Sequence, residues 1–181
     1  MRLPRSNSLP SGRRGFTLVE LMVTLTVAAI LLGAGVPSFL QLIQGQRITA
    51  AANDFFAALR LARSEAIKRG TRVDLVPAEG GADWSKGWVV FIDENGNQEP
   101  DGDEKRIFSH GPVPSGIDVT SNLNGQYIAY NGTGRTRTNA SSQSPQFGSL
   151  LFSWKQQTRK VVINFLGRVR ICNPALDHDT C

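Results

Sequence analysis

Histidine is scarce in this sequence, and its scarcity leaves no candidate for a histidine-based catalytic triad. The 181 residues include two histidines, His110 and His178, and neither belongs to a Ser-His-Asp arrangement. No glycine-rich phosphate loop is present, and the paired acids fall in one turn-rich segment. We therefore expect a protein that is not an enzyme, with no catalytic residue, no metal site and no cofactor.

Cysteine is equally scarce, since Cys172 and Cys181 are the only two and lie at the end of the chain. In an exported protein, a lone pair separated by so short a segment predicts a disulfide. The alternative is two unpaired thiols in a frayed tail. A metal site is not expected, because His178 and the acids near it lack a four-ligand spacing.

Acidic residues are missing from two parts of the chain. None lies among Arg2, Arg5, Arg13 and Arg14, and without these four the basic and acidic residues nearly balance, at 16 and 15. The pI near 9.7 therefore does not by itself indicate a nucleic-acid-binding protein. Residues 119–176 contain seven basic residues and no acid, whereas residues 74–118 contain ten acids and three bases. This separation of acidic and basic residues along the chain is a better indication of a binding partner than the net charge of the whole chain.

One long apolar run is present. Phe16 to Val36 spans 21 residues with a single charge, Glu20, and is long enough to cross a bilayer. A carboxylate in that position is costly. Pro37 follows and predicts a kink. Beyond it, apolar residues spaced three and four apart predict a helix with one buried face, ending near Gly70. They are Ile48, Ala52, Phe55, Leu59, Ala62 and Ala66.

Short segments rich in Val, Ile, Phe and Trp follow, separated by Gly, Pro, Asn and Asp, and they predict strands. The candidates are Thr71–Val76, Gly87–Asp93, Arg106–Ser109, Ile117–Thr120, Gln126–Tyr130, Ser149–Trp154, Lys160–Phe165 and Arg168–Cys172.

The apolar run allows several interpretations. A conventional signal peptide would have a shorter, uncharged apolar region, and a twin-arginine signal is only partly matched by R-R-G-F. A plain membrane anchor would not explain Glu20. The segment G-F-T-L-V-E, preceded by basic residues, resembles the leader of type IV prepilins and pseudopilins. The resemblance implies cleavage after Gly15 by a prepilin peptidase and methylation of Phe16 as the new N-terminus. It also implies a role for Glu20 in assembly and methylation.

The charge on Glu20 then has a physical explanation. Cleavage exposes an amino group on Phe16 that is mostly protonated at neutral pH. A buried carboxylate is tolerable when it is paired, so Glu20 would dock against the Phe16 amine of a neighbouring subunit.

The segment W-S-K-G-W-V-V-F-I-D-E-N-G-N-Q-E-P-D-G-D-E-K-R-I (Trp84–Ile107) resembles the strand and loop of FimT/GspH-type minor pilins. Calcium binding by Asp93, Asn95, Asn97 and Glu104 is an alternative for this loop, but Gln98 stands where an EF-hand loop has glycine. A turn-rich hairpin loop is the expectation.

The tail contains G-R-V-R, which matches a G-R-x-R motif associated with DNA binding in FimT-like pilins. Gly167, Arg168 and Arg170 carry the match. In a strand Arg168 and Arg170 would share one face, with Val169 and Ile171 facing inward. The remaining candidate DNA-binding residues are Arg135 and Arg137, in a second G-R-T-R segment, with Arg159 and Lys160. The alternative to DNA binding is a basic surface that is solvated, or one that contacts an acidic neighbouring subunit.

The resemblance implies an α+β type IV pilin fold, in which a long N-terminal helix packs on an antiparallel β-sheet domain. We expect a cleaved leader over 1–15, a transmembrane and filament-core helix over 16–42, an amphipathic helix over 43–70, and a β-rich domain with a disulfide-bonded tail over 71–181. The expected location is the bacterial inner membrane, with the C-terminal domain in the periplasm, and then a pilus at the cell surface.

The function implied is a minor pilin that captures double-stranded DNA through its phosphates for natural transformation. Its other partners would be major and minor pilins and the prepilin peptidase. The alternative is a structural minor pilin, or a type II secretion pseudopilin, that primes or caps a filament without binding DNA.

Overall fold

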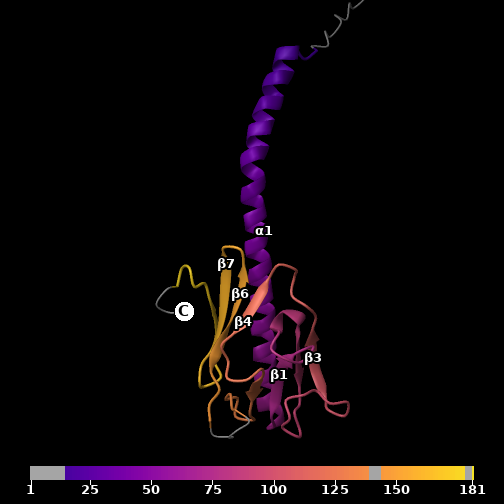
Figure 1. The fold of residues 1–181 in the computed structure, drawn as a ribbon, viewed down its shortest axis with the longest axis vertical. Helices are drawn as coiled ribbons and strands as arrows, with labels where there is room; N and C mark the ends of the chain where they lie inside the picture. Colours follow the sequence, from indigo (N-terminus) through magenta and orange to yellow (C-terminus); the bar gives the residue numbers. More distant parts are fainter. Residues whose placement is uncertain (1–14, 139–143, 178–180) are drawn as a thin grey trace, which may run out of the picture. The chain divides into compact units, whose positions relative to one another are not determined.

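A computed structural model of the chain describes residues 15–138, 144–177 and 181. It contains one long helix and eight strands within that part of the chain (Figure 1). The chain divides into two compact units, one ending at Gln41 and the other running from Leu42 to Cys181. Most of the expected leader lies outside the described residues.

The helix α1 runs from Leu18 to Arg69 without interruption. Thr17 caps its start, because the Thr17 hydroxyl accepts a hydrogen bond from the Glu20 amide at 3.2 Å. Within the described residues, α1 is the one helix long and apolar enough to cross a membrane. The kink expected near Pro37 stays a prediction.

The part of α1 in the second unit buries the predicted face. All six apolar residues of the predicted stripe, Ile48 to Ala66, are fully buried. The prediction of an amphipathic helix ending near Gly70 is confirmed.

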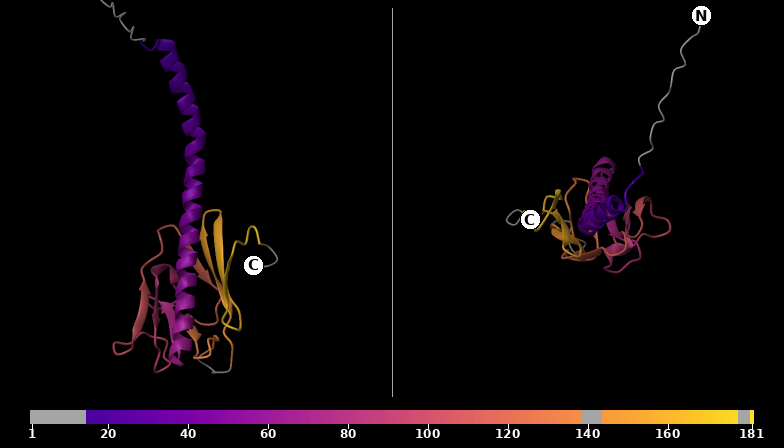
Figure 2. Two further views of the ribbon diagram at one scale, coloured as in Figure 1. Left: turned by 180° about the vertical axis from the view of Figure 1, so that it is seen from behind. Right: turned by 90° about the horizontal axis from the view of Figure 1, so that it is seen from above.

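The strands form two four-stranded antiparallel sheets. One has the order β3-β2-β1-β5 and the other β4-β6-β7-β8. Figure 2 shows both sheets against the same stretch of α1. The strand bounds are β1 Val73–Pro77, β2 Trp88–Phe91, β3 Arg106–His110, β4 Asp118–Ser121, β5 Ile128–Tyr130, β6 Gly148–Trp154, β7 Gln157–Ile163 and β8 Val169–Cys172.

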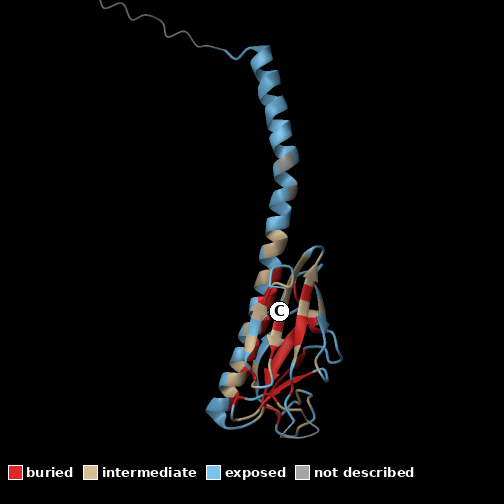
Figure 3. Ribbon diagram, turned by 90° about the vertical axis from the view of Figure 1, so that its left-hand side faces the viewer, coloured by how far each residue is buried: buried red, intermediate tan, exposed pale blue. Residues whose placement is uncertain are grey.

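Phe55 of α1 links the two sheets within one core. Its ring meets Trp88 of β2 edge-on at 5.1 Å between centroids and lies 5.9 Å from Phe152 of β6. Trp84 meets it edge-on from a short 3₁₀ helix, η1 (Trp84–Lys86). Figure 3 shows the buried residues on the strands and on the helix face beside them. Because the buried core lies wholly in the second unit, this unit has the core that independent folding needs.

All eight predicted strands are present, with shifts at their ends. β7 begins at Gln157, earlier than predicted, and ends at Ile163 because a tight turn follows. Arg168 therefore precedes β8 instead of opening it. His110, expected in a loop, is the last residue of β3 and stacks on Trp88 with 4.1 Å between ring centroids.

Candidate nucleic-acid interface

The turn between β7 and β8 presents the first G-R-x-R segment. Its ends are closed by two backbone bonds, from the Asn164 amide to the Arg168 carbonyl at 3.0 Å and from the Gly167 amide to the Asn164 carbonyl at 2.8 Å. The Asn164 side-chain oxygen also accepts bonds from the Leu166 and Arg168 amides. Gly167 has a φ of 73°, the left-handed conformation that such a turn requires at this position.

The turn after β5 repeats this geometry. The Asn131 amide donates to the Arg135 carbonyl at 3.0 Å, and the Gly134 amide donates to the Asn131 carbonyl at 2.8 Å. The Asn131 side-chain oxygen accepts from the Thr133 and Arg135 amides, and Gly134 also has a φ of 73°. Both segments read N-x-x-G-R-x-R, so the shared asparagine is the sequence signal that G-R-x-R alone does not capture. We call these two segments, Asn131–Arg137 and Asn164–Arg170, the paired turns.

The paired turns pack directly against each other. A Cβ atom added to Gly167 would lie 2.7 Å from the Gly134 carbonyl oxygen and 3.1 Å from the Thr136 amide nitrogen. The Gly167 carbonyl accepts hydrogen bonds from the Tyr130 hydroxyl at 3.3 Å and from Arg63 Nη1 at 2.9 Å. The two G-R-x-R segments, far apart in the sequence, therefore form one surface.

Three arginines of this surface are exposed: Arg135, Arg168 and Arg170. Their guanidinium groups have no hydrogen-bond or ion-pair partner within the described residues. On β8, Val169 and Ile171 pack against the core, whereas Arg168 and Arg170 are exposed, so the predicted alternation of faces is present. Arg137 is half-buried, and its Nη1 donates to the Thr136 carbonyl at 2.9 Å.

A groove of about 500 Å³ runs beside the β7–β8 turn along α1. Arg60 and Arg63 of α1 and Arg168 of the turn supply its charges. Phe56, Ile67 and Val169 supply apolar surface to the same groove. Sequence reasoning did not include Arg60 and Arg63 in the site, although both fall off the apolar stripe of the helix.

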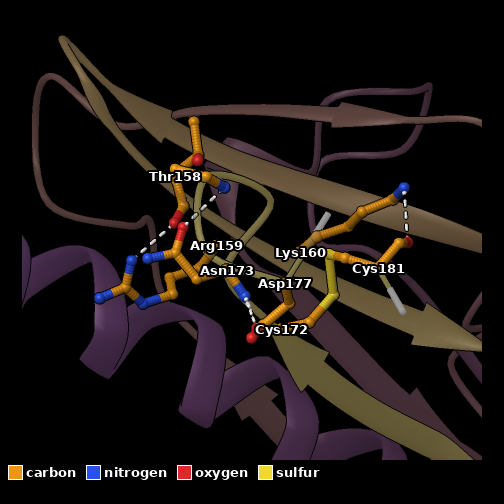
Figure 4. The surroundings of a disulfide bond; sticks show 8 residues. Thr158, Arg159, Lys160, Cys172, Asn173, Asp177 and Cys181 are labelled. Atoms are coloured by element: carbon orange, nitrogen blue, oxygen red, sulfur yellow. Dashed lines mark hydrogen bonds between the residues drawn. A yellow bond between two sulfur atoms is a disulfide. The ribbon is translucent and has the colours of Figure 1, made fainter. Parts of the chain in front are cut away.

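The remaining two candidates lie elsewhere on the second sheet, around the disulfide (Figure 4). Arg159 pairs in register with the buried Phe152, so it faces the helix side of the sheet, and its Nη1 donates to the Thr158 carbonyl. Lys160 faces outward, but its Nζ donates to the Cys181 main-chain oxygen at 3.1 Å. The structure therefore does not bring Arg159 together with the paired turns.

The predicted disulfide is present between Cys172 and Cys181. It holds the tail beside β7, where Lys160 meets Cys181. Within the tail, the Asp177 carboxylate accepts a bond from the Asn173 amide at 2.8 Å. His178 lies outside the described residues.

The acidic loop between β2 and β3 is held by its own hydrogen bonds. Asp93 is buried and accepts bonds from the Gly96 and Gln98 amides. Glu104 accepts bonds from the Glu94 and Asp101 amides. The flanking elements are strands, as the hairpin interpretation predicts, whereas an EF-hand loop joins two helices. Among the described residues, no three side chains of ligating type converge on a possible metal position.

Beside this loop, Arg72 bridges two buried carboxylates. Its guanidinium donates to both oxygens of Asp74, at 2.7 and 2.6 Å, and its Nε lies 3.5 Å from Asp93 Oδ2. Burial raises the pKa of Asp74 to about 7, against the opposing effect of Arg72. This pair lies at β1 of the first sheet and contains no residue of the basic half of the sequence.

At the other end of the chain, Glu20 lies in the first turn of α1. The positive end of the helix dipole favours a carboxylate there. Gly15 and Phe16 precede the helix, and Phe16 is exposed.

The long helix packed on antiparallel sheets defines a pilin fold. The solved structure of the type IV minor pilin FimU of Pseudomonas aeruginosa shares it, with a TM-score of 0.58 and 15% identity over 73% of this chain and 92% of that one. The minor pseudopilin EpsH of the Vibrio cholerae type 2 secretion system shares it with a TM-score of 0.51 and 14% identity over 71% and 98%.

Sequence comparison then identifies the family. Residues 51–167 match the family described as type II transport protein GspH, and residues 10–36 match the prokaryotic N-terminal methylation motif. The chain is also 30% identical over 166 residues to the pilin-like protein PilA1 of Thermus thermophilus, covering 88% of this chain and 98% of that protein. The chain belongs to the GspH family of minor pilins and pseudopilins.

Membership of this family confirms that the chain is a structural protein and not an enzyme. It implies assembly with other pilins and processing by a prepilin peptidase. The apolar part of α1 fits residence in the inner membrane before assembly into a pilus.

Proposed function

We propose that this GspH-family protein is a FimT-like minor pilin that binds extracellular DNA for uptake in natural transformation. The observation that carries the proposal is the pairing of two N-x-x-G-R-x-R turns, which places exposed Arg135 and Arg168 on one surface. Arginine forks suit phosphate oxygens, and contacts to phosphate carry little sequence information. Binding is then largely independent of sequence and sensitive to salt.

The surrounding charge supports the same proposal. Residues 119–176 hold no acid, so no carboxylate in that range neutralises the paired turns. Arg60 and Arg63 extend the positive charge into the groove along α1. Arg170 and Lys160 lie on the outer face of the same sheet, whereas Arg137 is half-buried and Arg159 faces the helix side. Arg135, Arg168 and Arg170 are the principal phosphate ligands in this proposal.

We also propose the processing and division expected from the sequence. The peptidase cuts after Gly15, Phe16 becomes the methylated N-terminus, and Glu20 pairs with the Phe16 amine of a neighbouring subunit. Residues 1–15 are then the leader, 16–42 the membrane and filament-core helix, 43–70 the helix that packs on the domain, and 71–181 the domain itself.

A DNA-binding titration of residues 43–181 with a duplex, over a salt series, tests the proposal. Arg168→Ala combined with Arg170→Ala should weaken binding to any duplex sequence and reduce the slope of log K against log salt by up to about 1.8. The control, Lys155→Asn, removes one exposed charge at the β6–β7 turn, where the φ of 54° suits asparagine. It should change the slope little.

Unchanged affinity of the folded double variant would overturn the proposal. The alternative function would then stand, in which the subunit primes or caps a pilus or a type II secretion pseudopilus without binding DNA.

A further inference from the structure

One exposed phenylalanine lies within the paired turns and a second lies close to them, next to a strand of the second sheet. Phe165, in the turn after β7, is 59% exposed, and Phe147, immediately before β6, is 57% exposed. Isolated apolar residues on a surface need no explanation. These two require one because the register of the second sheet places them at the same end, where Gly148 of β6 pairs with Ile163 of β7.

Hydrogen bonds also hold Phe147 next to the turn after β5. The neighbouring Gln146 is buried, and its carbonyl accepts a bond from the Thr136 hydroxyl. The Gln146 side chain also accepts from the Ala129 amide and donates to the Tyr127 carbonyl. Phe147 is therefore fixed between the two turns, through Thr136 on one side and through the pairing of β6 with β7 on the other.

The charged side chains near these two rings indicate what kind of partner they would bind. The nearby exposed side chains of the paired turns, Arg135 and Arg168, are cationic, so the partner is anionic. A nucleic acid combines an anionic backbone with flat aromatic faces, but in an intact duplex those faces are stacked on neighbouring bases. Unpaired bases are the part of DNA that can stack on an exposed aromatic ring while the phosphates remain with the arginines.

We propose that Phe147 and Phe165 stack on unpaired bases, so that this surface prefers single-stranded segments and frayed ends of DNA to intact duplex. The inference rests on the proposed DNA-binding function and specifies its ligand. The arginines supply contacts common to both forms of DNA, and the phenylalanines supply the contact that only unpaired bases complete.

The test compares three probes with residues 43–181: oligo(dT), an abasic deoxyribose-phosphate strand of equal length, and a blunt duplex. Phe147→Ala combined with Phe165→Ala should lower the affinity for oligo(dT) about tenfold or more. The affinities of this double variant for the abasic strand and for the duplex should stay within about twofold of those of the unmutated protein. The Phe165→Trp variant should keep the preference for oligo(dT) over the duplex, because an indole ring also stacks on unpaired bases.

Phe108→Ala is the matched control, since Phe108 is a partly exposed phenylalanine on β3 of the other sheet. It should leave all three affinities unchanged. If the double variant lost affinity equally for all three probes, or lost none for oligo(dT), the inference would be overturned and the proposed function would still stand. A loss of filament incorporation by the double variant, with unchanged affinity for oligo(dT), would assign the rings to a neighbouring subunit and also overturn it. Failure of the unmutated protein to bind any probe would overturn both proposals.

Discussion

Arg63 of α1 and Gly167 of the β7–β8 turn are joined by a hydrogen bond of 2.9 Å, although 104 residues separate them in the sequence. A Cβ atom on Gly134, in the other turn, would lie 3.2 Å from Arg63 Nε. Arg63 is therefore in contact range of both paired turns. It fixes the turns against the helix as well as contributing charge to the groove.

Replacing Arg63 tests this role. Arg63→Leu should lower the free energy of unfolding of residues 43–181 by about 1 kcal/mol, because it removes a partly buried hydrogen bond to a carbonyl. Arg60→Leu is the control on the same helix, since Arg60 is exposed and contacts the Phe56 ring. It should cost less than about 0.5 kcal/mol. Urea unfolding measures both, and equal costs would contradict the anchoring role.

Gly167→Ala tests why the motif begins with glycine. The alanine would need a left-handed conformation and would place its Cβ 2.7 Å from the Gly134 carbonyl oxygen. We expect a loss of about 2 to 5 kcal/mol of stability, from backbone strain and overpacking together. Gly96→Ala is a matched control, because Gly96 has a similar φ of 77° and open space around it. A cost no greater than that of Gly96→Ala would show that the turns are not closely packed.

Asp74 predicts a pH dependence of stability. Its pKa is raised to about 7 in the folded state by burial, from an ordinary value near 3.8. The folded protein therefore holds the proton more tightly than the unfolded chain does. This stabilisation is complete below about pH 4 and is lost as pH rises to about 7, by up to about 4 kcal/mol.

Urea unfolding between pH 4 and pH 8 measures the effect. Asp74→Asn should flatten the decline, because the amide does not titrate. Asp118→Asn, on an exposed residue of β4, should leave the decline in place. A decline that survives in Asp74→Asn would assign the pH dependence to another group.

Glu20→Ala tests the proposed assembly contact. Cleavage after Gly15 should continue, whereas incorporation into filaments should fall about tenfold or more, because the Phe16 amine of the neighbouring subunit loses its partner. Thr24→Val is the control, since it alters a polar residue one turn further along α1 without touching the carboxylate. Immunoblots of sheared filaments and of membranes report incorporation and processing. Normal incorporation of Glu20→Ala would remove this explanation of the carboxylate.

The periodicity and composition of the sequence predict most of the fold. The stripe from Ile48 to Ala66 follows from helical periodicity, because burial of one helix face leaves a direct pattern. The strands follow from apolar and aromatic runs between turn residues, since β1, β2 and β5 are buried throughout and show no alternation. The ends of β7 are less predictable, since the short turn after Trp154 sets its start and the turn over 164–168 sets its end. The 3₁₀ helix at Trp84 was missed, because three residues carry too little periodicity.

The site was predicted only in part. Arg168, Arg170 and Arg135 were expected from a motif, but the contact between Gly167 and Gly134 depends on tertiary packing that no local pattern encodes. The same applies to Arg63, whose partner lies in the β7–β8 turn. Arg159 was grouped with these residues by charge alone. Its register opposite Phe152 places it on the other side of the sheet.

Mapping the DNA contacts by NMR tests the central proposal most directly. Duplex DNA is titrated into isotope-labelled residues 43–181, and shifts of the backbone amides are followed at low salt. The account predicts that the largest shifts fall together on 131–137 and 164–170 and reverse as salt is raised. Shifts centred on the acidic loop from Asp93 to Glu104, or the absence of any salt-reversible shift, would contradict it.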